Sequence, residues 1–312
     1  MTKQHSKDFW WSHKVEATDE YASGDGGATA GAMTKMTDSG VAAGKPAGKP
    51  TMPMKEYSRE VIESMGDDDW IQTVFTNGLE SIEGDIPLYL QDKTWLTQIL
   101  QAATGAIPAL SRTVHWQHGK TSVGVPRRFE SFGVLCKKWK LESVAGDKLP
   151  TQTITPFCYK TKTDIGDGDD VTAFDKLAFV TTAPCRAKDI TISIEGTTVK
   201  YKKLTVEIET IYDEEIEGGD DATLEPRVVS RNITIDVDFK DPLDTVSVHP
   251  LTETDPAAIN VIVTMAAPMS ATITCTNLRI AKADNEKLPE KLEIYPRTLE
   301  IVKGTDTTVV LS

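Results

Sequence analysis

Residues that could bind a metal ion occur at two places in the sequence. His115 and His118 are three positions apart, but the flanking pattern is extended, and in a strand such residues face opposite sides. The aspartates between Asp164 and Asp170 resemble a calcium loop in composition, yet they lack the EF-hand order of acids, central glycine and terminal glutamate. A solvated loop is the favoured interpretation, with an adventitious cation as the alternative. We therefore expect no metal centre and no cofactor.

Residue patterns that support catalysis are also missing from the sequence. GxSxG, GxxxxGK[ST] and HExxH do not occur, and the glycine-rich pieces at 24–27 and 166–168 are not followed by a helical pattern. The cysteines form no CxxC pair, so we expect reduced, structural residues at Cys136, Cys158, Cys185 and Cys275. The sequence gives no reason to expect an enzyme.

The most concentrated charge lies in the run from Asp213 to Asp221. Such a run is usually the solvated tip of a hairpin. The alternative is a contact between copies of the chain, in which these acids meet a basic patch such as 200–203 or Arg127–Arg128. Charge complementarity of this kind fixes register more than it adds affinity. The candidate contact residues in the run are Asp213, Glu214, Glu215, Asp220 and Asp221.

The chain as a whole is acidic and globular in composition. Its 312 residues carry 34 lysines and arginines against 47 acidic residues, a formal net charge of -13. Most of such a surface repels nucleic acid. The charge therefore disfavours a function in which the protein binds nucleic acid through its phosphates. With 39% hydrophobic residues we expect one or two domains. No apolar run approaches the ~20 residues of a membrane span, and Met1–Trp11 lacks the apolar core of a signal peptide.

The elements expected to position the charged residues are mainly β-strands. Apolar and polar residues alternate over 190–194, continue one step out of phase over 204–208, and alternate again over 233–239. The phase change near Lys202 predicts a β-bulge. The polar second faces suit the wall of a water-filled channel, although any antiparallel sheet in a soluble protein has one wet face. These polar residues are Thr191, Ser193, Glu195, Thr234, Asp236 and Asp238.

Helical patterns are few. A short helix is predicted over Glu56–Met65, and a clearer one over Trp95–Ala103, with an apolar stripe, Asp92 as its cap and Gly105 as its stop. Many short strands with turns between them favour a mainly β fold. We expect an antiparallel β-sandwich or barrel flanked by one α-helix and carrying long loops.

The chain divides into an extended N-terminal arm at 1–55, a β-sandwich domain at 56–285 and a C-terminal extension with closing strands at 286–312. Trp10 and Trp11 belong to the arm and precede a stretch with little apolar bulk. Either the arm is a tail without fixed structure, or it becomes ordered against a neighbouring subunit that receives these aromatic residues.

Four segments, together covering roughly residues 70–280, follow one another in a characteristic order. They are LESIEGDI at 79–86 leading to the helix at 95–103, FGVLCKKWKLESVAGD at 132–147, AKDITISIEG at 187–196 continuing into LTVEIE at 204–209, and EPRVVSRNITIDVDF at 225–239. This order resembles that of the tail tube proteins of long-tailed, non-contractile phages and archaeal tailed viruses.

The resemblance implies a structural virion protein whose rings, commonly hexameric, stack into a hollow tube for genome delivery. Its partners would be further copies of itself, other tail proteins and double-stranded DNA that passes without specific binding. The protein would be made in the host cytoplasm and reside in the virion tail. Thr234, Asp236 and Asp238 would then face the lumen, and Trp10, Trp11 and the acidic run would contact neighbouring subunits.

Two other functions fit a β-sandwich. A binding module of adhesin, lectin or fibre type would present loops such as 164–170 to a carbohydrate or receptor, as a monomer or small oligomer. Another virion part, such as a tail terminator or a capsid decoration protein, can share the sandwich. Long tubes or stacked rings would support the tail tube hypothesis, whereas small dispersed particles that bind glycans would support the binding module.

Overall fold

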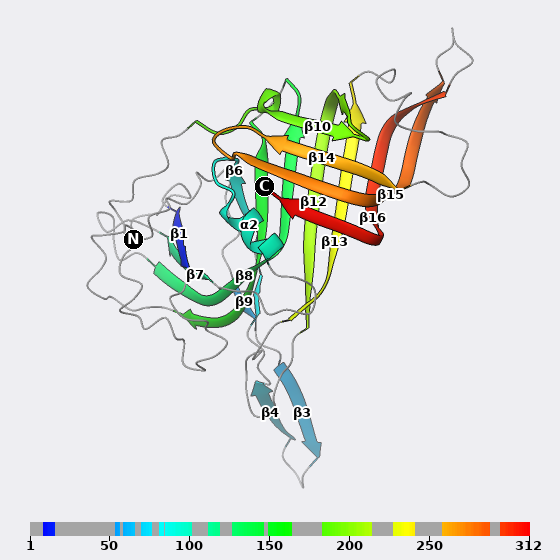
Figure 1. The fold of residues 1–312 in the computed structure, drawn as a ribbon. Helices are drawn as coiled ribbons and strands as arrows, with labels where there is room; N and C mark the ends of the chain where they lie inside the picture. The colour runs from blue at the N-terminus through cyan, green and yellow to red at the C-terminus, as the bar shows by residue number, and fades with distance from the viewer. Residues whose placement is uncertain are drawn as a thin grey trace.

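The structure is a computed structural model. It describes residues 9–15, 54–56, 59–65, 70–76, 81–83, 85–101, 112–118, 127–146, 149–163, 183–213, 227–240, 258–287 and 294–312. These residues form a mainly antiparallel β fold with one α-helix beside it (Figure 1), which confirms the fold class expected from the sequence. The predicted loop at 164–170 lies outside the described residues.

Most strands belong to one twelve-stranded antiparallel sheet. Its main path runs β1-β7-β8-β12-β13-β16-β15-β14-β10-β11, while β9 pairs with β8 and β6 pairs with β9. The strands are β1 (Phe9–Val15), β6 (Ile86–Tyr89), β7 (Arg112–His118), β8 (Arg127–Val144), β9 (Thr151–Thr163), β10 (Ile190–Ile194), β11 (Thr197–Val199), β12 (Tyr201–Asp213), β13 (Arg227–Phe239), β14 (Ile259–Met265), β15 (Ala271–Lys287) and β16 (Ile294–Leu311).

The sheet curls back on itself to make two layers. The long strands β8, β12 and β13 form one layer, and β10, β14, β15 and the end of β16 cross it (Figure 1). The apolar faces of the two layers share one core, in which Trp139 of β8 and Phe239 of β13 are fully buried together with Ile192 of β10 and Ile273 of β15. Each layer therefore keeps one face outside this core.

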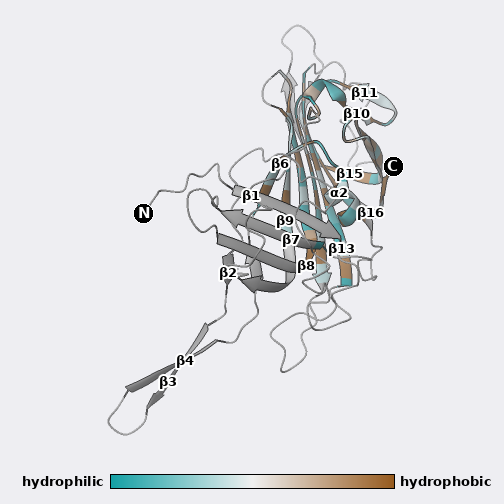
Figure 2. Ribbon diagram, turned by 90° about the vertical axis from the view of Figure 1, so that its left-hand side faces the viewer, coloured by the Kyte–Doolittle hydropathy of each residue, from teal (hydrophilic) through white to brown (hydrophobic). Residues whose placement is uncertain are grey.

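Alternating residues explain why these segments form strands. In β13 the buried positions alternate with exposed or half-buried ones from Ile233 to Phe239, and β10 shows the same period. Figure 2 shows hydrophilic and hydrophobic residues alternating along the strands. The pairing of β12 with β13 shifts register between Tyr201 and Lys203, which confirms the bulge predicted near Lys202.

The helix α2 (Thr94–Gln101) begins where the sequence predicted it. Oδ1 of Asp92 accepts hydrogen bonds from the backbone N of Thr94, at 2.7 Å, and from its hydroxyl. Trp95, Leu96 and Ile99 on the apolar stripe are buried. The side chain of Gln98 donates to the carbonyl of Val134 and accepts from the backbone N of Cys136, so the helix is fixed to β8.

The helix predicted over Glu56–Met65 is wrong. The segment holds the end of β2 (Met54–Glu56), which pairs with β5 (Ser81–Glu83), and the strand β3 (Arg59–Met65), which pairs with β4 (Trp70–Thr76). Val61 and Ile62 are β-branched and lie opposite Val74 and Thr73, so a hairpin suits them better than a helix. Figure 1 shows this hairpin projecting from the main sheet. Within the described part of the chain, no helix is long and apolar enough to cross a membrane.

Candidate functional site

The outer face of the long-strand layer carries a broad array of charged and hydroxyl side chains, called the polar face below. Carboxylates outnumber lysines on it. Its residues are Lys138, Lys140 and Glu142 of β8, Lys203, Thr205, Glu207 and Glu209 of β12, Thr234, Asp236 and Asp238 of β13, and Thr298 and Glu300 of β16. Thr151, Thr153 and Thr155 of β9 continue it with hydroxyl groups beside the β8 residues.

Strand register brings these residues together in rows across the sheet. In one row Glu142, Thr205, Asp236 and Glu300 are direct neighbours on β8, β12, β13 and β16. In antiparallel sheets such cross-strand neighbours interact through their side chains. Because alternate residues of the same strands fill the core, the register that packs the core also fixes the polar face.

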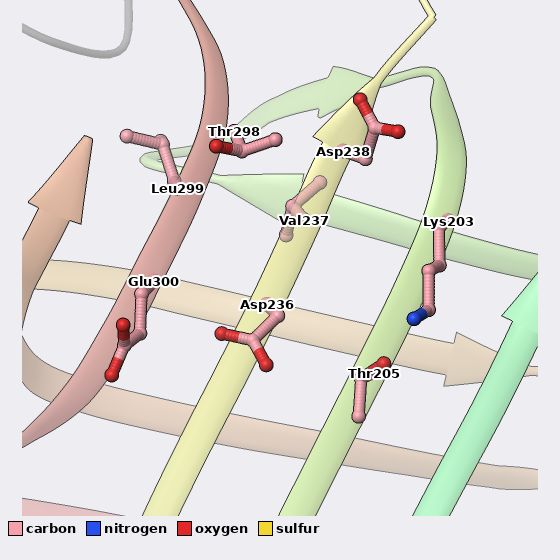
Figure 3. A pocket seen from close by; sticks show the side chains of 8 residues that line it. All are labelled: Lys203, Thr205, Asp236, Val237, Asp238, Thr298, Leu299 and Glu300. Atoms are coloured by element: carbon pink, nitrogen blue, oxygen red, sulfur yellow. The ribbon is translucent and has the colours of Figure 1, made fainter. Parts of the chain in front are cut away.

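A pocket of about 320 Å³ lies on this face over β12, β13 and β16. Figure 3 shows its side chains, with the crossing strands of the second layer behind the three strands that carry them. One carboxylate oxygen of Asp238, Oδ1, is buried and has no hydrogen-bond partner among the described residues. The lining residues from the polar face are Lys203, Thr205, Asp236, Asp238, Thr298 and Glu300.

Ion pairs neutralise only one side of the polar face. Nζ of Lys138 lies 2.6 Å from Oε1 of Glu207, and Nζ of Lys140 lies 2.7 Å from Oε1 of Glu142. The described residues supply no ion-pair partner for Asp236, Asp238 or Glu300. The β13 and β16 side of the face is therefore the more negative.

The pKa of Asp236 reflects its burial and the neighbouring carboxylates. Its partial burial, together with the carboxylates of Glu300 and Glu207, raises the pKa of Asp236 above its ordinary value. Lys203 and Lys140 oppose the shift but do not cancel it. At neutral pH the ionised carboxylate of Asp236 therefore carries an electrostatic cost in the folded protein.

This cost predicts how stability depends on pH. A carboxyl whose pKa is higher in the folded state carries no penalty below its unfolded pKa, near 3.9, and the full penalty above its folded pKa. We expect Asp236→Asn to raise the free energy of unfolding at pH 7 by at most about 1 kcal/mol, because solvent screens a partly exposed charge. At pH 3 the variant and the parent should be equally stable. Denaturant unfolding at both pH values checks this, and a variant less stable than its parent at pH 7 would contradict it.

The structure brings together the three residues predicted to face a lumen, since Thr234, Asp236 and Asp238 all lie on the polar face. The other predicted polar group, Thr191, Ser193 and Glu195, belongs to β10 and its turn in the crossing layer. Both strands direct isoleucines into the shared core, so their polar residues are on opposite outer surfaces. Only one group can line a single channel.

The predicted contact residues belong to β1 and to the end of β12, or lie outside the described residues. Trp10 and Trp11 are in β1 and lie opposite Gln117 and Trp116 of β7. Asp213 ends β12 and lies opposite Arg227. The remaining predicted contacts, Glu214, Glu215, Asp220 and Asp221, are outside the described residues.

Metal-binding groups and cysteine thiols are two further kinds of candidate site. The described part of the chain contains no group of three or more His, Cys, Asp or Glu residues that could hold a metal ion. Cys136, Cys185 and Cys275 are buried and free. Burial raises the pKa of Cys275 to about 12 and also raises the pKa of Cys136, so neither thiol is a ready nucleophile.

Sequence reasoning missed most of the polar face. It identified the β13 residues but not the charged residues of the neighbouring strands, which are Lys138, Lys140, Glu142, Glu207 and Glu300. The signal was present, because the charged residues of β8 and β12 alternate with buried ones such as Trp139, Leu141, Val206 and Ile208. The sequence alone does not reveal the strand register that brings these residues side by side.

Comparison of the sequence with protein families and curated proteins identifies no relative. No protein-family model matches the sequence, and no curated protein matches it at a significant level. Fold and surface chemistry are therefore the basis for a functional assignment.

Proposed function

We propose that the protein is a self-assembling tail tube subunit of a tailed virus. Its copies form rings that stack into a conduit for double-stranded DNA, and the polar face lines the bore. The observation that carries this proposal is the acid-rich polar face, which extends across β8, β12, β13 and β16 on the outer side of a curled sheet. The order of elements in the sequence, which resembles that of tail tube proteins, supports the same assignment.

The charge of the polar face suits DNA that must move without binding. Carboxylates facing a phosphate backbone repel it, and a protein that offers few cations releases few counterions and gains little affinity. The lysines at 138 and 140 are already paired with glutamates and are less available to phosphates. A duplex in such a bore would be surrounded by like charge and would remain mobile.

Open strand edges support assembly through the sheet. β13 pairs with β16 only over Thr234–Asp238, so this ladder covers five of the 13 residues of β13. The pairing of β14 with β15 begins at Leu278, which leaves 279–287 of β15 open on its other side within the same set of strands. Unpaired strand edges favour pairing with another chain, and closure into a cylinder removes them.

Electron microscopy of the purified protein, combined with sedimentation, tests the proposal. We expect stacked rings or long tubes of uniform bore. Small dispersed particles at all protein concentrations would contradict a tube subunit. Binding of those particles to a glycan array would instead favour the adhesin-type alternative.

A further inference from the structure

The pocket over β12, β13 and β16 holds more negative than positive charge. Its charged side chains are the carboxylates of Asp236, Asp238 and Glu300 and the ammonium group of Lys203. These groups are ionised at neutral pH, so the pocket carries an excess of two negative charges. Burial of Asp236 and the carboxylates of Glu300 and Glu207 raise the pKa of Asp236, which is a further sign of this excess. A ligand with two positive charges would balance the pocket.

The carboxylate of Asp238 supplies independent evidence for a ligand. Its Oδ1 is buried, and no described residue donates a hydrogen bond to it. Lys203 lies opposite Asp238 in the strand register, but Figure 3 shows its amine directed along β12 toward Thr205 and away from Asp238. A buried carboxylate oxygen without a donor is unfavourable. This position therefore favours a ligand with N–H groups.

The carboxylates occupy two ends of the pocket. Asp236 lies opposite Glu300 across β13 and β16, and Asp238 lies opposite Thr298 two residues further along β13, or ~6.6 Å at the usual rise of a strand. Figure 3 shows the first pair at one end and the second pair at the other. Among the described residues, no three acids, histidines or cysteines are grouped closely enough to hold a metal ion. The separated charges therefore suit a ligand with two cationic groups better than a single metal ion.

Alkylammonium groups match these positions in chemistry and in spacing. Each has three N–H donors and no acceptor, which suits carboxylates and the hydroxyl oxygens of Thr205 and Thr298 in the same pocket. An extended chain of four carbon atoms separates the two nitrogens of a diamine by a distance comparable to two residues of a strand. The volume of about 320 Å³ is at the lower end of the range for small-molecule sites.

We propose that the pocket binds a linear aliphatic diamine, with one ammonium group at Asp238 and the other between Asp236 and Glu300. All of these residues belong to one subunit, so binding goes beyond the proposed function and does not depend on ring assembly. A lysine side chain of another copy carries only one ammonium group and would reach only one end of the pocket. Each bound diamine would offset the excess charge of one pocket and make the polar face less negative.

Calorimetric titration of the purified full-length protein with putrescine, a four-carbon diamine, tests this site at low salt and neutral pH. One variant, Asp238→Asn, changes one end of the pocket. A second variant combines Asp236→Asn with Glu300→Gln and changes the other end. The matched control, Glu209→Gln, removes a carboxylate from the polar face outside the pocket. Butylamine has the same chain with one ammonium group, and Mg²⁺ has two charges on one ion, so these two probes test the need for separated cationic groups.

The parent should bind one putrescine per chain. Each pocket variant should weaken binding by about tenfold or more, because it removes charged hydrogen-bond acceptors, whereas Glu209→Gln should bind like the parent. Butylamine and Mg²⁺ should bind the parent by about tenfold or more weakly than putrescine, since neither reaches both ends. Circular dichroism checks the fold, and the double variant decides the outcome if Asp238→Asn does not fold.

Three results would overturn the diamine site. They are no saturable binding of putrescine by the parent, equal binding by the parent and the folded pocket variants, and binding of butylamine or Mg²⁺ as tight as that of putrescine. None of these results would affect the tube function, because electron microscopy of the same preparation tests assembly separately. Absence of rings would likewise leave diamine binding to the subunit intact.

Discussion

Assemblies in which Asp236, Asp238 and Glu300 are replaced by lysine are expected to hold DNA that the parent assemblies release. Each replacement changes the charge at its site from negative to positive, and all three residues line the same pocket on the polar face. Lysines contact phosphates and release counterions, so retention should fall steeply with salt, with a slope near 0.9 per phosphate contact on logarithmic axes. Filter binding or co-sedimentation with linear duplex DNA at 0.05 to 0.2 M salt, a range set by the same dependence, measures the effect.

A neutral variant provides the control for this result. Asp236→Asn, Asp238→Asn and Glu300→Gln remove the repulsion without adding cations, so DNA retention should lie between the parent and the lysine variant. The neutral variant also avoids placing new lysines beside Lys203, which lines the same pocket. Equal DNA retention by the parent, neutral and lysine assemblies would show that the polar face does not meet DNA.

Replacing Trp139 by alanine is expected to lower the free energy of unfolding of the subunit by about 3 to 5 kcal/mol, the usual cost of removing a large aromatic residue from a core. Trp139 is fully buried beneath the polar face, between Lys138 and Lys140 on β8. Its indole Nε1 donates to Oε1 of Gln152 at 2.9 Å, and Nε2 of Gln152 donates to the carbonyl of Asp92 at 3.1 Å. The substitution thus removes packing and also disturbs the link between β8, β9 and the start of the helix.

Denaturant unfolding of the dispersed subunit measures this loss. Trp139→Phe is the matched variant, since it keeps an aromatic ring but leaves the buried Gln152 oxygen without its donor, at a cost of about 1 to 3 kcal/mol. Alanine should therefore cost more than phenylalanine. A loss below about 1 kcal/mol for alanine would mean that the two layers do not depend on this contact.

The strand pattern could be predicted from sequence because burial in this fold has a period of two. The alternation in β13 and β10 is regular enough to place Thr234, Asp236 and Asp238 on one side of their strand and to detect the bulge near Lys202. The helix could also be predicted from the sequence, because its cap and its apolar stripe are local features.

Features that depend on long-range pairing could not be predicted. Glu142, Asp236 and Glu300 become neighbours in one row only through the register of β8, β12, β13 and β16. The opposite placement of the polar residues of β10 and β13 follows from the curl of the sheet, which no local pattern encodes. The strand at 59–65 was mistaken for part of a helix because its apolar residues do not alternate cleanly and its partner strand decides the outcome.

Site-specific labelling tests most directly whether the polar face lines a bore. Asp236→Cys places a thiol on the polar face, and Val310→Cys places one on the outer face of the crossing layer, where Val310 is 57% exposed. Each variant is labelled with biotin maleimide as the dispersed subunit, assembled, and then exposed to streptavidin. We predict that assembly abolishes streptavidin binding at position 236 and preserves it at position 310. Streptavidin binding at position 236 that is as strong in assembled as in dispersed protein would contradict the account.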